Sequence, residues 1–140
     1  MRQSIRVRQP MPPVAAVLSF IDGINRGDVA HLASLMTDNH RLQVFDEPPL
    51  DGKEGNIEAW SGYTSSFPSY VIYPHHFVAR KTEVIVLGHT TGSHLNLPDE
   101  QESRQTLLWR ATVRDGRLSL WQLISDTPAR RTEFGFGIDA

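Results

Sequence analysis

An Asp-Gly pair at positions 115–116 separates two β-rich runs, residues 103–114 and 118–126. Asp-Gly favours a two-residue turn, because both residues accept the left-handed backbone conformation that such a turn requires. The two runs are therefore predicted to form an antiparallel hairpin. Two further β-rich runs, residues 70–80 and 82–96, precede it, so we expect the second half of the chain to form a sheet.

Helix-forming patterns fill the first half of the chain. Pro12 and Pro13 can open a helix, because proline is tolerated in the first helical turn. Gly27 is a natural stop for this helix, and Asp28 can cap a second, shorter one. Apolar side chains spaced three and four residues apart support both predictions. They are Val14, Val17, Leu18, Ile21 and Ile24 in the first helix and Leu32, Leu35 and Met36 in the second.

A short strand, residues 41–46, is predicted next, and the prolines at 48–49 end it. A third helix should follow, because Asp51 and Glu54 stand at the spacing of a capping box. Pro68 closes this helix. Its apolar side is formed by Ile57, Trp60, Tyr63 or Thr64, and Phe67.

Helices followed by long antiparallel strands predict an α+β domain with the helices on one face of the sheet. The 140 residues suit a single domain, which we place at residues 13–127 after an N-terminal arm, residues 1–12. The polar segment 97–102 is expected to be a loop. The C-terminal tail, residues 128–140, could cross a partner subunit, cover the pocket or remain a frayed end.

The composition excludes several classes of function. The formal net charge is −2, whereas nucleic-acid binding usually needs a basic surface, so no nucleic-acid partner is expected. The chain has no cysteine, which excludes disulfides and thiolate metal sites. It shows neither a secretory signal nor an apolar run of about 20 residues, so we expect a cytoplasmic protein with no membrane partner.

Several local phrases resemble the SnoaL-like branch of the nuclear-transport-factor-2-like superfamily in their order and spacing. They are residues 20–28 (Phe-Ile-Asp-Gly-Ile-Asn-Arg-Gly-Asp), 52–55 (Gly-Lys-Glu-Gly), 92–94 (Gly-Ser-His) and 113–118 (Val-Arg-Asp-Gly-Arg-Leu). The resemblance implies a cone-shaped fold, in which three N-terminal helices pack on a strongly curved, mainly antiparallel sheet. It also implies a common tendency to form homodimers. The cone interior of this family hosts cyclases, isomerases, epoxide hydrolases and dehydratases, together with non-catalytic binders.

The positions that correspond to the family's catalytic residues hold no ionisable side chain in this chain. Leu123 stands where the polyketide cyclases place an acid/base aspartate, and Trp109 stands where they place a histidine. Phe20 stands at the tyrosine position of the steroid-isomerase-like members, and Val44 at the position of their base. Asp46 lies two residues further on, on the same strand face as Val44. It is therefore our candidate general base, and the alternative is a residue that only stabilises the following Pro-Pro turn.

The histidines offer a second set of candidates. His75 and His76 are adjacent in a predicted strand, so their side chains should point to opposite faces. One of them could face the pocket as a proton carrier, and the alternative is an exposed or core-edge position. The spacing of the histidines does not bring ligands to one point, so no metal site is expected. No nucleotide or dinucleotide fingerprint is present either, and we expect no cofactor.

Aromatic and apolar side chains are the candidates for ligand contacts. They would stack on a flat hydrophobic molecule, whereas the alternative is that they fill the core. The candidate ligand-binding residues are Phe20, Val44, Trp60, Tyr63, Trp109, Trp121 and Leu123.

The last strand alternates in a way that predicts a partner as well as a pocket. Alternation separates Ser119, Trp121, Leu123 and Ser125 from Leu118, Leu120, Gln122 and Ile124. The resemblance to the SnoaL-like family implies that the first of these sets faces the pocket, which leaves the second on the outer face of the sheet. An outer apolar patch of this kind predicts a homodimer through the sheet, with pairing at a strand edge as the competing geometry.

The leading hypothesis is a SnoaL-like domain that binds a small hydrophobic molecule in an apolar pocket. If it is an enzyme, it is expected to be a cofactor-independent isomerase, dehydratase or cyclase with Asp46 as the base. Tyr63, Trp109 and one of His75 or His76 would then orient the substrate. The alternative is a non-catalytic binding or dimerisation module, because Leu123, Phe20 and Trp109 cannot transfer protons.

Overall fold

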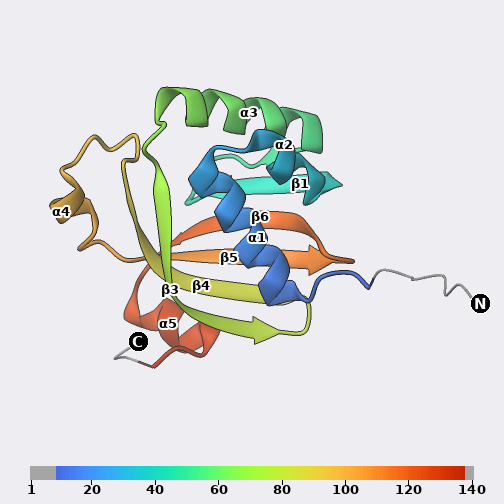
Figure 1. Cartoon of the computed structure of the whole chain (residues 1–140). Coiled ribbons are helices and arrows are strands. Elements are labelled where there is room, and N and C mark those ends of the chain that lie inside the picture. The colour runs from blue at the N-terminus through green and yellow to red at the C-terminus, as the bar shows by residue number, and fades with distance from the viewer. Residues whose placement is uncertain (1–8, 138–140) are drawn as a thin grey trace, which may run out of the picture.

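The computed structural model describes residues 9–137, in which one mixed sheet has helices on both of its faces (Figure 1). The strands lie in the order β2-β1-β6-β5-β4-β3. β1 and β6 run parallel, whereas the other neighbouring strands run antiparallel. Their bounds are Met36–Val44 for β1, Leu50–Asp51 for β2, Val71–Arg80 for β3, Glu83–Thr91 for β4, Leu107–Arg114 for β5 and Arg117–Ser125 for β6.

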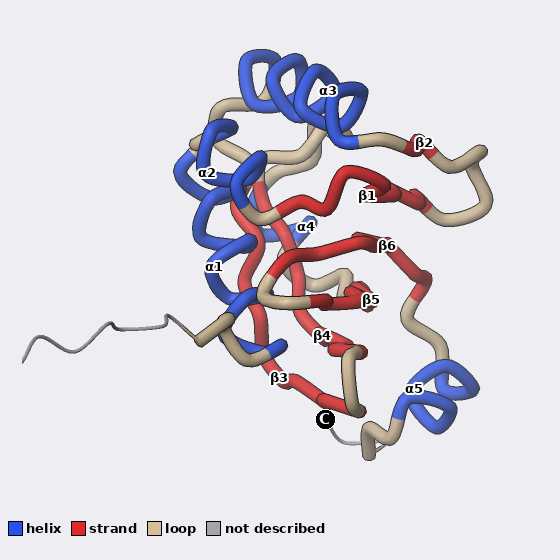
Figure 2. The backbone as a smooth tube through the Cα atoms, turned by 90° about the vertical axis from the view of Figure 1, so that its right-hand side faces the viewer, coloured by secondary structure: helices blue, strands red, loops and turns tan. Residues whose placement is uncertain are grey.

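The first three helices lie on one face of the sheet, which we call the inner face. α1 packs against β3, β4, β5 and β6, and α3 packs against β1, while α5 lies on the opposite, outer face (Figure 2). This arrangement confirms the predicted α+β fold with N-terminal helices on a curved, mainly antiparallel sheet. The helices are α1 Pro13–Arg26, α2 Val29–Ser34, α3 Lys53–Ser66, α4 Asp99–Glu102 and α5 Pro128–Phe134.

Local sequence signals set the ends of several elements, as predicted. α1 begins at Pro13 and ends at Gly27, which takes a left-handed backbone with φ of 63°. Asp28 caps α2, because its Oδ1 accepts a hydrogen bond of 3.0 Å from the amide of His31. The β5–β6 hairpin turns at Asp115 and Gly116, whose φ angles are 51° and 77°. Both angles fit the two-residue turn that Asp-Gly predicts.

Several element predictions are wrong, and residues 92–96 and 103–106, which were predicted as strand, lie outside β4 and β5. β1 begins at Met36, which was assigned to the second helix, and it ends at Val44. α3 has no side-chain cap, because Gly52 is its N-cap residue and Asp51 instead forms an ion pair with Arg41 at 2.6 Å. Residues 99–102, predicted as loop, form the one-turn helix α4.

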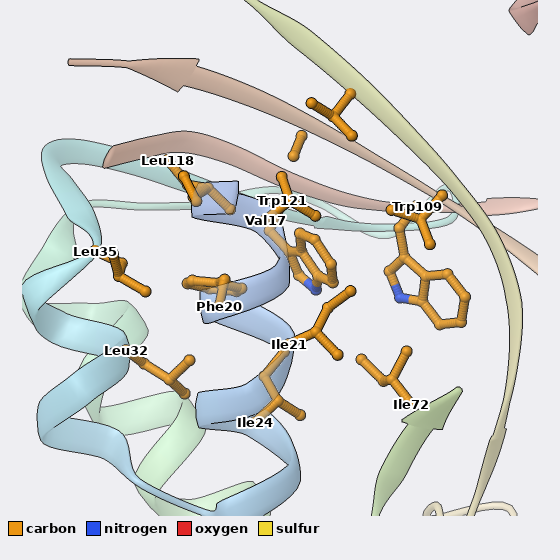
Figure 3. Close-up of a cluster of buried hydrophobic side chains, with 14 of the residues drawn as sticks. Val17, Phe20, Ile21, Ile24, Leu32, Leu35, Ile72, Trp109, Leu118 and Trp121 are labelled. Carbon is orange, nitrogen blue, oxygen red and sulfur yellow. The ribbon is translucent and has the colours of Figure 1, made fainter. Parts of the chain in front are cut away.

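The main core lies between α1 and the inner face of the sheet. Phe20, Ile21 and Ile24 of α1 belong to this core together with Trp109 and Trp121, which come from β5 and β6 (Figure 3). The two indoles stack with ring centroids 6.4 Å apart, and Phe20 lies 5.1 Å from the Trp121 ring. Each fully buried side chain of this size contributes about 1.5–3 kcal/mol through the hydrophobic effect. The aromatic residues of the last two strands therefore hold the sheet onto α1.

The outer face is partly covered by the chain itself. Phe134 and Phe136 are buried in a second apolar cluster with residues of β4, β5 and β6, including Ile124. The segment 128–137 therefore packs on the outer face, and neither a frayed end nor a pocket cover describes it. The expected arm, residues 1–12, lies mostly outside the described residues, as do residues 138–140 of the tail.

A β-bulge changes which side chains of β6 face inward. Thr112 pairs with Leu120, whereas Val113 pairs with Leu118, so Ser119 is the extra residue. An extra residue in one strand reverses the alternation beyond it. Leu118 therefore lies in the main core, and its predicted outward position is wrong. Leu120 and Gln122 remain half-buried on the outer face.

Candidate functional site

A cavity of about 320 Å³ lies between α3, the ends of β1 and β6, and the segment that connects β4 to β5. Its volume is at the lower end of the range typical for small-molecule sites. Most of the side chains around it are apolar or aromatic. The lining residues are Leu42, Val44, Phe45, Ala59, Trp60, Tyr63, Tyr70, Thr90, Ser93, His94, Leu95, Glu102, Gln105, Leu107 and Leu123.

Two large apolar side chains line the cavity and are also exposed to solvent. Phe45 is 40% exposed and Leu95 is 53% exposed. Phe45 follows β1 directly and has a φ of 49°, an unusual conformation for a large side chain. These two residues mark the open end of the cavity. A partly apolar entrance suits a ligand that is itself apolar.

A buried carboxylate forms part of the cavity wall. Glu102 is 2% exposed, and Thr90 beside it is 3% exposed. The Thr90 hydroxyl donates a hydrogen bond to Glu102 Oε2, and the amide of Ser93 donates one of 3.3 Å to Oε1. Hydrogen bonds of this kind offset part of the cost of removing a carboxylate from water.

A tyrosine–histidine pair lies on the same lining. The hydroxyl of Tyr63 and Nδ1 of His94 are 3.0 Å apart, and the His94 amide donates to the same hydroxyl at 3.2 Å. Burial raises the pKa of Tyr63, the hydrogen bond from His94 lowers it, and the charge of Glu102 raises it further. Tyr63 therefore remains a neutral phenol at physiological pH and can donate a hydrogen bond.

Tyr70 also lines the cavity and is shielded from water. Its side chain is buried, and burial is the main reason that its pKa is raised. The nearby Tyr63 and Glu102 raise the pKa of Tyr70 further through their charges. The charge of Glu102 therefore acts on both tyrosines, which means that the three polar groups are close enough to interact electrostatically.

The turn after β4 brings this wall together. Gly92 has a φ of 70°, and a Cβ atom on it would lie 2.3 Å from the carbonyl oxygen of Ser69. Only glycine fits such a close approach in the left-handed region. The turn directs Ser93 and His94 toward the cavity, and the chain then returns through α4 with Glu102. The Gly-Ser-His phrase of the sequence thus has a structural role.

The predicted ligand-binding residues divide into two groups. Val44, Trp60, Tyr63 and Leu123 line the cavity. Phe20, Trp109 and Trp121 are instead fully buried in the main core and do not contribute to the lining that the described residues form. The reason is packing, because the Trp121 ring lies against both Phe20 and Trp109 between α1 and the sheet.

The structure places Asp46 beside the cavity entrance but not in its wall. The strand stops at Val44, and the amide of Glu47 closes a turn onto the Val44 carbonyl at 2.9 Å. The side chain of Gln43 stabilises this turn by donating to the Phe45 carbonyl at 3.1 Å. Asp46 is therefore exposed in a turn, and the strand alternation that predicted an inward direction does not apply.

The two adjacent histidines lie on the edge strand β3, and both are exposed. The strand has a register shift between Pro74 and His76, so the expected alternation of these side chains is lost. His75 Nε2 lies 2.6 Å from His89 Nδ1. The pKa of His75 is lowered by partial burial and by the neighbouring His89 and His76. Neither His75 nor His76 reaches the cavity lining described above.

The polar wall was missed by sequence reasoning, which did not single out Glu102, Thr90, Ser93 or Tyr70. One signal was available, because Pro98 followed by acidic residues is typical of a helix start. It could have identified α4. Which of the carboxylates in residues 99–102 turns inward depends on contacts with β4, which the local sequence does not contain.

Two structural observations concern metals and membranes. Within residues 9–137, no three histidine, aspartate or glutamate side chains converge closely enough to hold a metal ion. None of the helices in this part of the chain is long and apolar enough to cross a membrane.

Comparisons with known proteins agree with this geometry. The model of the SnoaL-like domain matches residues 17–121. No curated protein matches the chain. An uncharacterized cystatin-fold protein from Novosphingobium aromaticivorans superposes with a TM-score of 0.70 at 18% identity, covering 81% of this chain and 98% of that one.

Two further solved structures that are similar to this chain are of proteins described as enzymes. A proposed polyketide cyclase from Sinorhizobium meliloti has a TM-score of 0.65 at 19% identity, with 81% of this chain and 94% of that chain covered. An epoxide hydrolase from M. tuberculosis has a TM-score of 0.67 at 15% identity, with 81% and 78% covered. At these identities the likeness concerns the fold alone.

Proposed function

Because this chain belongs to the SnoaL-like domain family, we propose that it binds a small hydrophobic molecule in its cavity and acts on it by cofactor-independent acid/base chemistry. Isomerisation, dehydration and cyclisation are the reactions that suit such a site. The observation that supports the proposal is the composition of the cavity wall. Apolar side chains surround the space, and a few polar groups are part of the lining, among them Tyr63 and Glu102, which are close enough for the charge of Glu102 to raise the pKa of Tyr63.

An apolar lining removes water from a bound ligand, and hydrogen bonds and charges act more strongly in such surroundings than in bulk solvent. A proton donor and a proton acceptor on one wall can then serve a single functional group of the ligand. The rest of the ligand needs only shape and apolar contact, which Val44, Trp60 and Leu123 supply.

Binding can be tested without knowing the natural ligand. The flat aromatic alcohol 2-naphthol is the probe, and isothermal titration calorimetry is the measurement. Ala59 lines the cavity from α3, so Ala59→Phe should fill the space and weaken binding at least about tenfold, or about 1.4 kcal/mol. Ala30 is exposed on α2, so the matched variant Ala30→Phe should bind as the wild type does. Equal binding by both variants, or no binding by the wild type, would contradict the proposal.

A non-catalytic binding module is the second candidate, and the residues at the family's catalytic positions favour it. Leu123 and Trp109 cannot exchange a proton at neutral pH, so the chemistry would need a different group. Mass spectrometry of ligands that co-purify with the chain separates the candidates. Purified protein that converts such a ligand is an enzyme, whereas protein that returns it unchanged is a binder.

A further inference from the structure

We infer that Glu102 is the proton-accepting residue of the cavity, at a position different from the family positions that Phe20, Val44, Trp109 and Leu123 occupy. This inference rests on the proposed function, because it assigns the chemistry of the same cavity. The carboxylate comes from the one-turn helix α4, between β4 and β5, whereas the acid/base position on the last strand is Leu123. The carboxyl group thus reaches the cavity from a connecting segment instead of a strand.

Burial is the first argument. The other carboxylates of α4, Asp99 and Glu100, are exposed, whereas Glu102 is 2% exposed and lines the cavity. Moving a carboxylate out of water costs roughly several kcal/mol unless hydrogen bonds or an ion pair compensate for the lost hydration. A neutral polar residue would fasten α4 to β4 without this cost. A charged side chain in this place therefore suits a chemical role better than a purely structural one.

Hydrogen-bond capacity is the second argument. An ionised carboxylate can accept about four hydrogen bonds. The Thr90 hydroxyl takes one acceptor position on Oε2, and the Ser93 amide takes one on Oε1. These two partners fix the orientation of the carboxylate and leave each oxygen able to accept a proton from a ligand. Thr90 and Ser93 are thus positioning groups.

A donor on the same wall is the third argument. The Tyr63 hydroxyl is on the lining, and its proton can turn from His94 toward a ligand oxygen because a phenol O–H rotates. The charge of Glu102 raises the pKa of both Tyr63 and Tyr70, so the carboxylate and the phenols are close in electrostatic terms. An acceptor and a donor facing one apolar space are the minimum for proton transfer next to a carbonyl group.

The step balances without any co-reactant. Glu102 removes a proton from the carbon next to a carbonyl group, so a C–H bond breaks and a carboxyl O–H bond forms. The electron pair moves onto the carbonyl oxygen, which accepts a hydrogen bond from Tyr63. If the substrate carries a double bond between its β- and γ-carbons, the enolate is conjugated with that bond. Return of the proton from Glu102 to the γ-carbon then moves the double bond to the α- and β-carbons, re-forms the carbonyl group and restores the carboxylate. The substrate class that fits is a neutral, mainly apolar molecule with an enolisable carbonyl group, because an anion would be repelled by Glu102.

The test uses 5-nitrobenzisoxazole, a flat neutral compound that reports general-base catalysis. A base removes its ring C–H proton, the electron pair forms a nitrile, and the N–O bond breaks to release a coloured phenolate. The wild type should accelerate this reaction above acetate at the same concentration, and 2-naphthol should inhibit it. Glu102→Gln should lower the rate about 100-fold, within the range of general-base catalysis. The matched variant Glu100→Gln, on the exposed side of α4, should keep the rate, as should Asp46→Asn.

The outcomes separate the inference from the proposed function. If Glu102→Gln binds 2-naphthol and retains the wild-type rate, or if the wild type is no faster than acetate, the inference is overturned while binding stands. If the wild type does not bind 2-naphthol, the proposed function itself fails. Should Glu102→Gln not fold, as judged by circular dichroism, Glu102→Asp decides. It keeps the charge but withdraws it by one methylene, so an unchanged rate with intact binding would overturn the inference.

Discussion

The hydroxyl of Thr90 donates a hydrogen bond to the carboxylate of Glu102, and both side chains are almost completely buried. This contact joins the end of β4 to α4 across the turn at Gly92. It fixes the direction of the only buried carboxylate among residues 9–137 that the structure places on the cavity wall. The loop between β4 and β5 is therefore an ordered part of the site.

Thr90→Val should destabilise the chain by about 1–3 kcal/mol, because it leaves a buried carboxylate oxygen without this donor. Urea denaturation followed by circular dichroism measures the change. Thr91→Val is the matched control, since the Thr91 hydroxyl makes an exposed hydrogen bond of 3.3 Å to Tyr73. It should cost less than about 0.5 kcal/mol. If both variants lose the same free energy of unfolding, the buried hydrogen bond does not stabilise the chain more than the exposed one.

Two glycine substitutions should act in opposite directions. Gly92→Ala should destabilise by at least about 1–2 kcal/mol, because the left-handed backbone penalises a Cβ and the Ser69 carbonyl leaves no room for one. Gly62→Ala should stabilise by about 0.5–1 kcal/mol, because Gly62 lies within α3 with open space around it. The melting temperatures of the two variants measure both effects. A higher melting temperature for Gly92→Ala would contradict the predicted clash between a Cβ atom at this position and the Ser69 carbonyl oxygen.

His40 should make stability depend on pH. Burial lowers the pKa of His40 below 6.5, while its hydrogen bond to the Leu118 carbonyl, at 2.6 Å, raises it by a smaller amount. The folded chain therefore holds a neutral imidazole at a pH where the unfolded chain binds a proton. The stability that follows is fully present above about pH 6.5 and decreases as the pH falls toward the folded pKa.

Replacing His40 tests that dependence. The free energy of unfolding of the wild type should fall between about pH 7.5 and pH 5.5, and His40→Phe should reduce the slope. His76→Gln, at an exposed position on β3, is the control and should leave the slope nearly unchanged. Urea denaturation at several pH values measures the slopes. An identical slope in wild type and His40→Phe would contradict the prediction.

The outer face of the sheet yields a prediction about assembly. We propose a homodimer through the part of this face that α5 leaves open, around Leu120 and Gln122. Leu120→Glu should then shift the chain toward a monomer in size-exclusion chromatography with light scattering. Leu18→Glu is the control, because Leu18 is an exposed leucine on α1. A monomeric wild type would exclude the dimer.

The sequence by itself determined the parts of the fold that depend on neighbouring residues. Pro13 and Gly27 set the ends of α1, and Asp115-Gly116 set the β5–β6 turn, because each acts through its own backbone conformation. The spacing within α3 also placed Trp60 and Tyr63 on one side of that helix, and both line the cavity. This prediction needed only the period of a helix, whereas the positions of Val44 and Leu123 were inferred from the resemblance to the family.

The tertiary structure decided which side chains meet. The bulge at Ser119 moved Leu118 into the core, and the turn at Phe45 exposed Asp46, although the alternation of both strands indicated otherwise. Glu102 was placed by contacts with Thr90 and Ser93, which are nine to twelve residues away along the chain. Local conformation follows from a residue and its neighbours, whereas burial of a charge is decided by the free energy of packing distant segments together.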